Sequence, residues 1–166
     1  TEAGHHELRL ALACFETEGT PMNLAIVHGL LALVALQRQD AAAMAAHNHR
    51  ARQQAQRCDF RRGLALADLV DAVAAAWSQD ATQARTLLAR GLAAFAEQGI
   101  AESLNHRLAA ETWLALGEPA AARAAADEAE AHEAVGAEAR DDERQYHRAR
   151  GDGDAVGAVS YTHLDA

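Results

Sequence analysis

Three short stretches of the chain decide the fold: QDAAAM at residues 39–44, QDATQA at 79–84 and GEPAAA at 117–122. Each places an acidic residue immediately before an alanine-rich run, as at the start of a helix. The stretches recur 40 and 38 residues apart. Self-similarity at such a spacing is typical of stacked helical hairpins, so the sequence predicts an all-α repeat array.

The composition favours helices over strands. Alanine accounts for 44 of the 166 residues, whereas aromatic residues make up only 4%. Alanine is the best helix former because it loses no side-chain entropy when a helix forms. The two prolines, Pro21 and Pro119, lie where helices are expected to begin. The β-branched residues form no alternating run, so a sheet has little support.

Capping residues divide the chain into helices of similar length. Thr20, Asp40, Asp59 and Asp80 are expected N-caps, and Gly99 is expected to be left-handed after a helix end. The connections are short, which forces neighbouring helices into antiparallel hairpins. The expected helices cover about residues 21–38, 40–58, 59–78, 80–98, 101–116 and 119–136, with one before Gly19 and a weaker one at 137–150.

The third stretch carries Gly117, Pro119 and Ala122 in the pattern that joins the two helices of a tetratricopeptide (TPR) repeat. When the chain is aligned to the TPR repeat through these three residues, a small residue recurs wherever the two helices of a hairpin cross. The sequence thus predicts a TPR-like α-α superhelix of stacked antiparallel helical hairpins. HEAT-like pairs, with a period of about 40–47 residues, stay the alternative, because a TPR usually repeats after ~34. The small positions are Ala32, Ala72 and Ala110 in first helices, and Ala51, Gly91 and Ala129 in second helices.

The stretches 84–99, 108–126 and 143–151 resemble the TPR region of large bacterial signalling ATPases. The resemblance covers about residues 25–151. It implies an array that follows an ATPase module and is joined to a nucleotide cyclase or a DNA-binding activator domain. The chain itself has no Walker loop, cyclase signature or helix-turn-helix, so those activities carry over to none of its residues.

The chain is expected to divide into an array at 1–150, truncated at both ends, and a disordered or non-native tail at 151–166. The tail begins with a glycine-rich turn. Its last part, from Val159 onward, departs from the alanine- and arginine-rich composition and resembles translated sequencing-adapter read-through.

Charge and hydropathy argue against two classes of partner. The net charge of −9 disfavours nucleic-acid binding by this segment. No stretch approaches the ~18 consecutive apolar residues of a membrane helix, so no membrane partner is expected. Cys14 and Cys58 lie far apart and belong to no CxxC pair, which predicts free thiols and a cytoplasmic location.

The sequence contains no constellation typical of catalysis or of metal binding. Its nine histidines include no HExxH motif, and zinc needs three or four convergent ligands. Asp152 and Asp154 lie in a glycine-rich turn but lack the spacing of an EF-hand. No serine or cysteine has the context of a nucleophile. We therefore expect no enzyme activity, no metal site and no cofactor.

A concave groove is the best candidate for a functional surface. If the TPR phase holds, first helices line this groove and could hold a segment of a partner protein. Alternatively, the large apolar residues form plain core between repeats, and Arg107 pairs with Glu111 four residues later. The inward positions are Ile26, Leu33, Leu36, Leu66, Leu69, Val73, Trp77, Leu104, Arg107, Glu111 and Leu114; those predicted to bind a partner are Leu69, Val73, Trp77, Leu104, Arg107 and Glu111.

The predicted function is a non-catalytic module within a larger bacterial signalling or transcriptional regulator. It would bind a protein or small effector, or neighbouring domains of its own polypeptide. The alternative is a purely structural helical spacer, or a HEAT-like scaffold, with no ligand.

Overall fold

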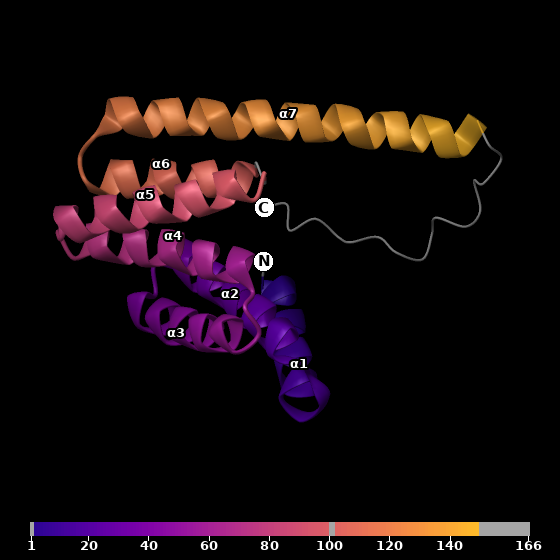
Figure 1. Ribbon diagram of the computed structural model, residues 1–166, viewed down its shortest axis with the longest axis horizontal. Coiled ribbons are helices and arrows are strands. Elements are labelled where there is room, and N and C mark those ends of the chain that lie inside the picture. The colour runs from indigo at the N-terminus through magenta and orange to yellow at the C-terminus, as the bar shows by residue number, and fades with distance from the viewer. Residues whose placement is uncertain (1, 100–101, 150–166) are drawn as a thin grey trace.

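The computed structural model describes residues 2–99 and 102–149, and this part of the chain forms α-helices and no strand (Figure 1). The prediction of an all-α fold is confirmed. The proposed tail, 151–166, lies outside the described residues. The helices are α1 (Glu2–Glu18), α2 (Pro21–Gln37), α3 (Ala41–Arg57), α4 (Arg61–Trp77), α5 (Ala81–Glu97), α6 (Ser103–Ala115) and α7 (Pro119–Ala149).

Consecutive helices pack as hairpins, α2 with α3, α4 with α5 and α6 with α7. Successive hairpins also contact one another, since α4 packs against α3 and α2, and α6 packs against α4 and α5. The N-terminal helix α1 packs against α2. Figure 1 shows the resulting stack, with α1, α2 and α3 at one end and α6 and α7 at the other. No described helix is long and apolar enough to cross a lipid bilayer.

Left-handed residues end the helices at near-regular intervals. The backbone φ angle is 56° at Gln39, 49° at Asp59, 61° at Gln79, 65° at Gly99 and 76° at Gly117. After Gln39, Gln79 and Gly117, the next amide donates to a carbonyl of the last helical turn at 2.9 Å, as in a Schellman motif. The helices α2, α3, α4 and α5 have 17 residues each and begin 20 residues apart.

Three of the four expected N-caps are confirmed. The side chains of Thr20, Asp40 and Asp80 each accept a hydrogen bond from the backbone amide three residues later. The prediction for Asp59 is wrong, because this residue ends α3 in the left-handed conformation and Phe60 precedes α4 without a side-chain cap.

The prediction of a helix end near Gly136 is also wrong, since α7 runs without interruption to Ala149. A single glycine in a helix interior costs only about 1 kcal/mol relative to alanine. The flanking alanine and glutamate residues are good helix formers and offset this cost. Consequently α7 extends well beyond α6, its hairpin partner (Figure 1).

The core is a strip of small and branched side chains that joins all three hairpins. Five of the six predicted small positions are buried, and Ala110 is only partly so. Gly91 shows why size matters, because a Cβ added there would lie 2.6 Å from Cδ2 of Leu69. Although α2 is apolar nearly all round, it is not enclosed on every side, since Met22 is 44% exposed and Ile26 is 42% exposed.

Candidate binding surfaces

The six residues predicted to bind a partner do not share one surface. Leu69 and Val73 are both 0% exposed, and Trp77 is partly buried against the same core. That core also contains Leu108 and Ala109 of α6, so Leu69 and Val73 fill the contact between hairpins. Leu69 and Val73 therefore lie in the core between hairpins and not on an open surface.

The other three residues lie in two different hollows. Leu104 lines an apolar cavity, whereas Arg107 and Glu111 line a wider groove. Arg107 pairs not with Glu111 but with Glu133 of α7, with 2.6 Å between Nη2 and Oε1. Whether any of these side chains contacts a partner stays a prediction.

The apolar cavity has a volume of about 260 Å³ and lies where α2, α4 and α6 meet. Four of its lining residues belong to the inward series that the sequence predicts, namely Ile26, Leu33, Leu66 and Leu104. Three of the four are partly buried, and Ile26 is the most exposed, at 42%. First helices of successive hairpins therefore contribute to one hollow.

A salt bridge forms part of the cavity lining. Arg62, at the start of α4, pairs with Glu102, which precedes α6. Phe60 also lines the cavity and lies close against Gly63, where an added Cβ would lie 2.5 Å from the Phe60 ring. The cavity is thus apolar within and carries one charged pair that could align a polar backbone or side chain.

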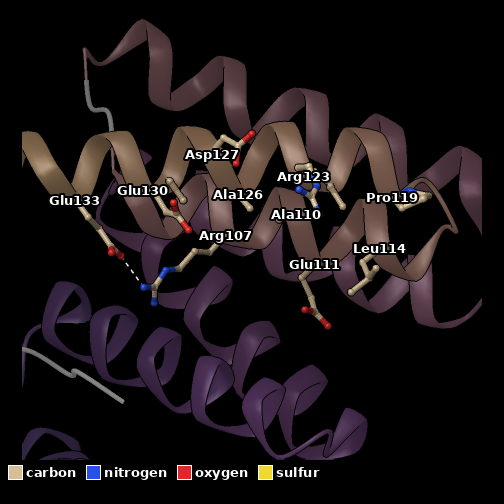
Figure 2. A pocket seen from close by; sticks show the side chains of 12 residues that line it. Arg107, Ala110, Glu111, Leu114, Pro119, Arg123, Ala126, Asp127, Glu130 and Glu133 are labelled. Atoms are coloured by element: carbon tan, nitrogen blue, oxygen red, sulfur yellow. Dashed lines mark ion pairs between the residues drawn. The ribbon is translucent and has the colours of Figure 1, made fainter.

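The wider groove runs between α6 and α7 and has a volume of about 800 Å³ (Figure 2). Its floor is built mainly from alanines and includes Leu114, which is 61% exposed. Charged side chains from both helices form its walls, and the Arg107–Glu133 pair spans its two sides (Figure 2). The charged lining residues are Arg107, Glu111, Arg123, Asp127, Glu130 and Glu133.

A buried charge network positions the helices that carry the cavity. Asp68 of α4 is buried and accepts hydrogen bonds from Arg90 of α5, while Arg52 of α3 lies 2.8 Å from the same carboxylate. Arg52 also bonds Asp71 at 2.6 Å, and Asn48 donates to Asp71 at 2.6 Å. Burial alone would raise the pKa of Asp68, but the hydrogen bonds from Arg90 and Arg52 outweigh it and hold that pKa below its ordinary value. Sequence reasoning missed this network, although Asp68 interrupts an apolar helix.

Two histidines form a second polar contact inside the N-terminal part of the stack. His28 of α2 is 4% exposed, and its Nδ1 lies 3.1 Å from Nδ1 of His47 in α3. Burial lowers the pKa of both rings, and the charge of Arg50 lowers both further. One ring must donate and the other accept, so the contact requires at least one neutral imidazole. Their separation of 19 residues gives no local sequence signal.

The described residues contain no cluster of three or more side chains that could hold a metal ion. Cys14 and Cys58 are both free thiols.

Comparison with known proteins leaves function to be inferred from these surfaces, because the chain matches no protein-family model, no curated protein and no solved structure.

Proposed function

We propose that this chain is a non-catalytic, TPR-like helical-repeat module that binds a segment of a partner protein in the apolar cavity. One observation carries the proposal. Ile26 and Leu33 of α2, Leu66 of α4 and Leu104 of α6 line the same hollow, although they come from three successive hairpins. A TPR-like array presents its first helices on one face in this way, and partners bind there.

The size and chemistry of the cavity favour a peptide side chain over a cofactor. Sites for drug-sized ligands span about 300–1,000 Å³, and this cavity, at about 260 Å³, lies below that range. Its inner lining is largely apolar, with Arg62 and Glu102 as the charged pair. One or two apolar side chains of a partner would fill it, each burial contributing about 1.5–3 kcal/mol.

In the wider setting, such a module would belong to a larger signalling or transcriptional regulator and would report partner binding to an output domain. The partner would be a separate protein or a neighbouring domain of the same polypeptide. A structural spacer is the second candidate. It is favoured by the complete burial of Leu69 and Val73, which shows that part of the first-helix face serves contact between hairpins.

The test uses two residues of α2 with nearly equal exposure. Ile26 lines the cavity, whereas Met22, one helical turn earlier, does not. Peptides selected on the purified chain from a displayed library would be measured by fluorescence anisotropy. We expect Ile26→Arg to weaken binding at least tenfold and Met22→Arg to leave it unchanged.

Two results would count against the proposal and favour the spacer. One is a selection that yields no peptide whose binding Ile26→Arg weakens. The other is an equal loss with Met22→Arg, which would show an effect of charge on α2 and not of the cavity. Thermal unfolding of both variants would establish that they remain folded.

A further inference from the structure

The groove between α6 and α7 corresponds in sequence to part of the α4–α5 hairpin, against which the next helix packs. Helix α4 packs against the α2–α3 hairpin, and α6 packs against the α4–α5 hairpin. Aligning the junctions at 79–84 and 117–122 relates each groove residue to one that precedes it by 38 positions. By this alignment the α6–α7 groove is equivalent to the α4–α5 surface that α6 covers.

The large apolar residues of the covered surface are replaced in the open one. Leu69 corresponds to Arg107, Val73 to Glu111 and Phe95 to Glu133. Leu69, Val73 and Phe95 are buried core residues. Arg107, Glu111 and Glu133, which replace them in the groove, are exposed. Another purely apolar helix would therefore leave charges without partners if it docked here.

The floor of the groove keeps the small side chains that let a helix approach. Ala84 corresponds to Ala122 and Gly91 to Ala129, while Leu114 adds one exposed apolar contact. The two walls are already held together by the Arg107–Glu133 salt bridge and by stacking of His106 on His132, with ring centroids 4.9 Å apart. The groove is thus preformed and is shaped for a helix.

The charge of the walls specifies the kind of helix. Carboxylates outnumber guanidinium groups, and Glu133 already pairs with Arg107. Glu111, Asp127 and Glu130 are exposed along both walls. A helix with lysine or arginine on its flanks would complement them, and its small apolar stripe would lie on the alanine floor.

We propose that the α6–α7 groove binds a basic amphipathic helix of a separate partner protein. This surface is distinct from the apolar cavity, because the two share no lining residue. It would recognise its partner by charge and helical shape, whereas the cavity selects apolar side chains.

The test uses the whole chain and three synthetic peptides of equal length. The first is an amphipathic helix with an Ala/Leu stripe flanked by lysines. The second keeps the stripe but has glutamates in place of the lysines, and the third scrambles the first so that charge is kept and the stripe is lost. By isothermal titration calorimetry at low salt, we expect the lysine helix to bind at least tenfold more tightly than either control.

Two charge-reversed variants locate the binding. Glu130 lines the groove, whereas Glu128, also exposed on α7, does not. We expect Glu130→Lys to weaken binding of the lysine helix about tenfold and Glu128→Lys to weaken it less than twofold. Leu114→Ala should also weaken binding, and Ile26→Arg should not, which separates this proposal from that for the cavity.

Several outcomes would overturn the proposal. Equal losses with Glu128→Lys and Glu130→Lys, or equal binding of the scrambled peptide, would show only nonspecific attraction to an acidic helix. Concentration-dependent self-association that Glu130→Lys abolishes, seen by analytical ultracentrifugation, would identify the occupant as a second copy of this chain. Circular dichroism would verify that each variant keeps its helices.

Discussion

Asp68 accepts two hydrogen bonds from Arg90, one from Nε to Oδ2 at 2.5 Å and one from Nη2 to Oδ1 at 2.6 Å. The same Oδ1 lies 2.8 Å from Nη1 of Arg52. One buried carboxylate therefore ties α3 and α5 to α4. Because α4 also provides Leu66 to the apolar cavity and Leu69 to the core, this network positions both.

Asp68→Asn is expected to lower the free energy of unfolding by about 2 kcal/mol. The neutral amide keeps one acceptor oxygen and loses the negative charge, so it cannot replace both carboxylate oxygens that face the two guanidinium groups; hydrogen bonds to charged groups contribute roughly 1.5–3 kcal/mol. The loss is kept moderate because Arg90 is half-exposed and stays hydrated. Urea unfolding followed by circular dichroism would measure it.

Asp71→Asn serves as the control for this change, because Asp71 is more exposed and lacks the contact with Arg90. Its expected loss is less than about 1 kcal/mol. If both variants lose the same stability, the network does not depend on Asp68 in the way the geometry indicates.

Acidification is expected to destabilise the fold through His28 and His47. The pKa of both rings is lowered in the folded state, mainly by burial. Above the ordinary pKa of about 6.5, both imidazole rings are neutral in the folded and in the unfolded chain, so they do not reduce the free energy of unfolding. Below pH 6.5 the histidines bind protons in the unfolded chain but not yet in the folded chain. The free energy of unfolding therefore falls as the pH falls toward the lowered pKa values.

The groups around the pair reinforce this direction. Arg50 lies near both rings, and the charge of His5 of α1 further lowers the pKa of His47. Glu16 of α1 opposes the shift at His28 but does not cancel it. The measurement is the free energy of unfolding between pH 7.5 and pH 5.

His28→Gln should flatten this pH dependence, because it removes one member of the pair. His49→Gln changes an exposed histidine on the same helix as His47 and should leave the slope as it is. An unchanged slope in His28→Gln would exclude the pair as its source.

Much of the helix order could be predicted from the sequence, because capping and left-handed turns are local. Asp40 and Asp80 cap the helices that follow them, as expected from their position before alanine-rich runs. Asp59 shows the limit of this reasoning. It has the side chain of a good N-cap, yet the near-regular spacing of the helices places it in the left-handed position that ends α3.

The binding surfaces could be predicted only in part, because α4 is apolar on more than one side. Its hydrophobic pattern does not reveal which stripe meets the next hairpin and which faces the cavity. Leu69 proves to be core and Leu66 to line the cavity, three residues apart on one helix. Pairs such as Arg90 with Asp68 depend on how α5 packs on α4, which no local pattern specifies.

Gln39→Gly is expected to raise the free energy of unfolding by about 0.5–1 kcal/mol. Gln39 has a φ angle of 56°, where a side chain is strained and glycine is not. The gain is smaller than the relieved strain, because glycine also makes the unfolded chain more flexible. Thermal unfolding would measure the change.

Ala89→Gly provides the opposite control, since Ala89 lies exposed within α5. There glycine should lower stability by about 1 kcal/mol. A loss of stability in Gln39→Gly as well would show that the left-handed conformation is not what limits that position.

Gly91→Ala is expected to destabilise the protein by about 1–3 kcal/mol, although alanine is the better helix former. The added Cβ would lie 2.6 Å from Cδ2 of Leu69 and 3.1 Å from the backbone oxygen of Ala65. Leu69 is fully buried, which leaves its side chain little room to turn, and the oxygen belongs to the backbone of α4. Chemical denaturation would give the size of the loss.

Gly29→Ala is the matched control, because its added Cβ would meet only Cδ2 of Leu66, at an ordinary 3.6 Å. It should be neutral or stabilising by up to about 1 kcal/mol. In the double variant Gly91→Ala with Leu69→Ala, the clash with Leu69 disappears and only the close contact with the Ala65 oxygen stays, so the loss should be smaller than the two single losses combined. Additive losses would show that close packing of Leu69 on Gly91 does not set the distance between α4 and α5.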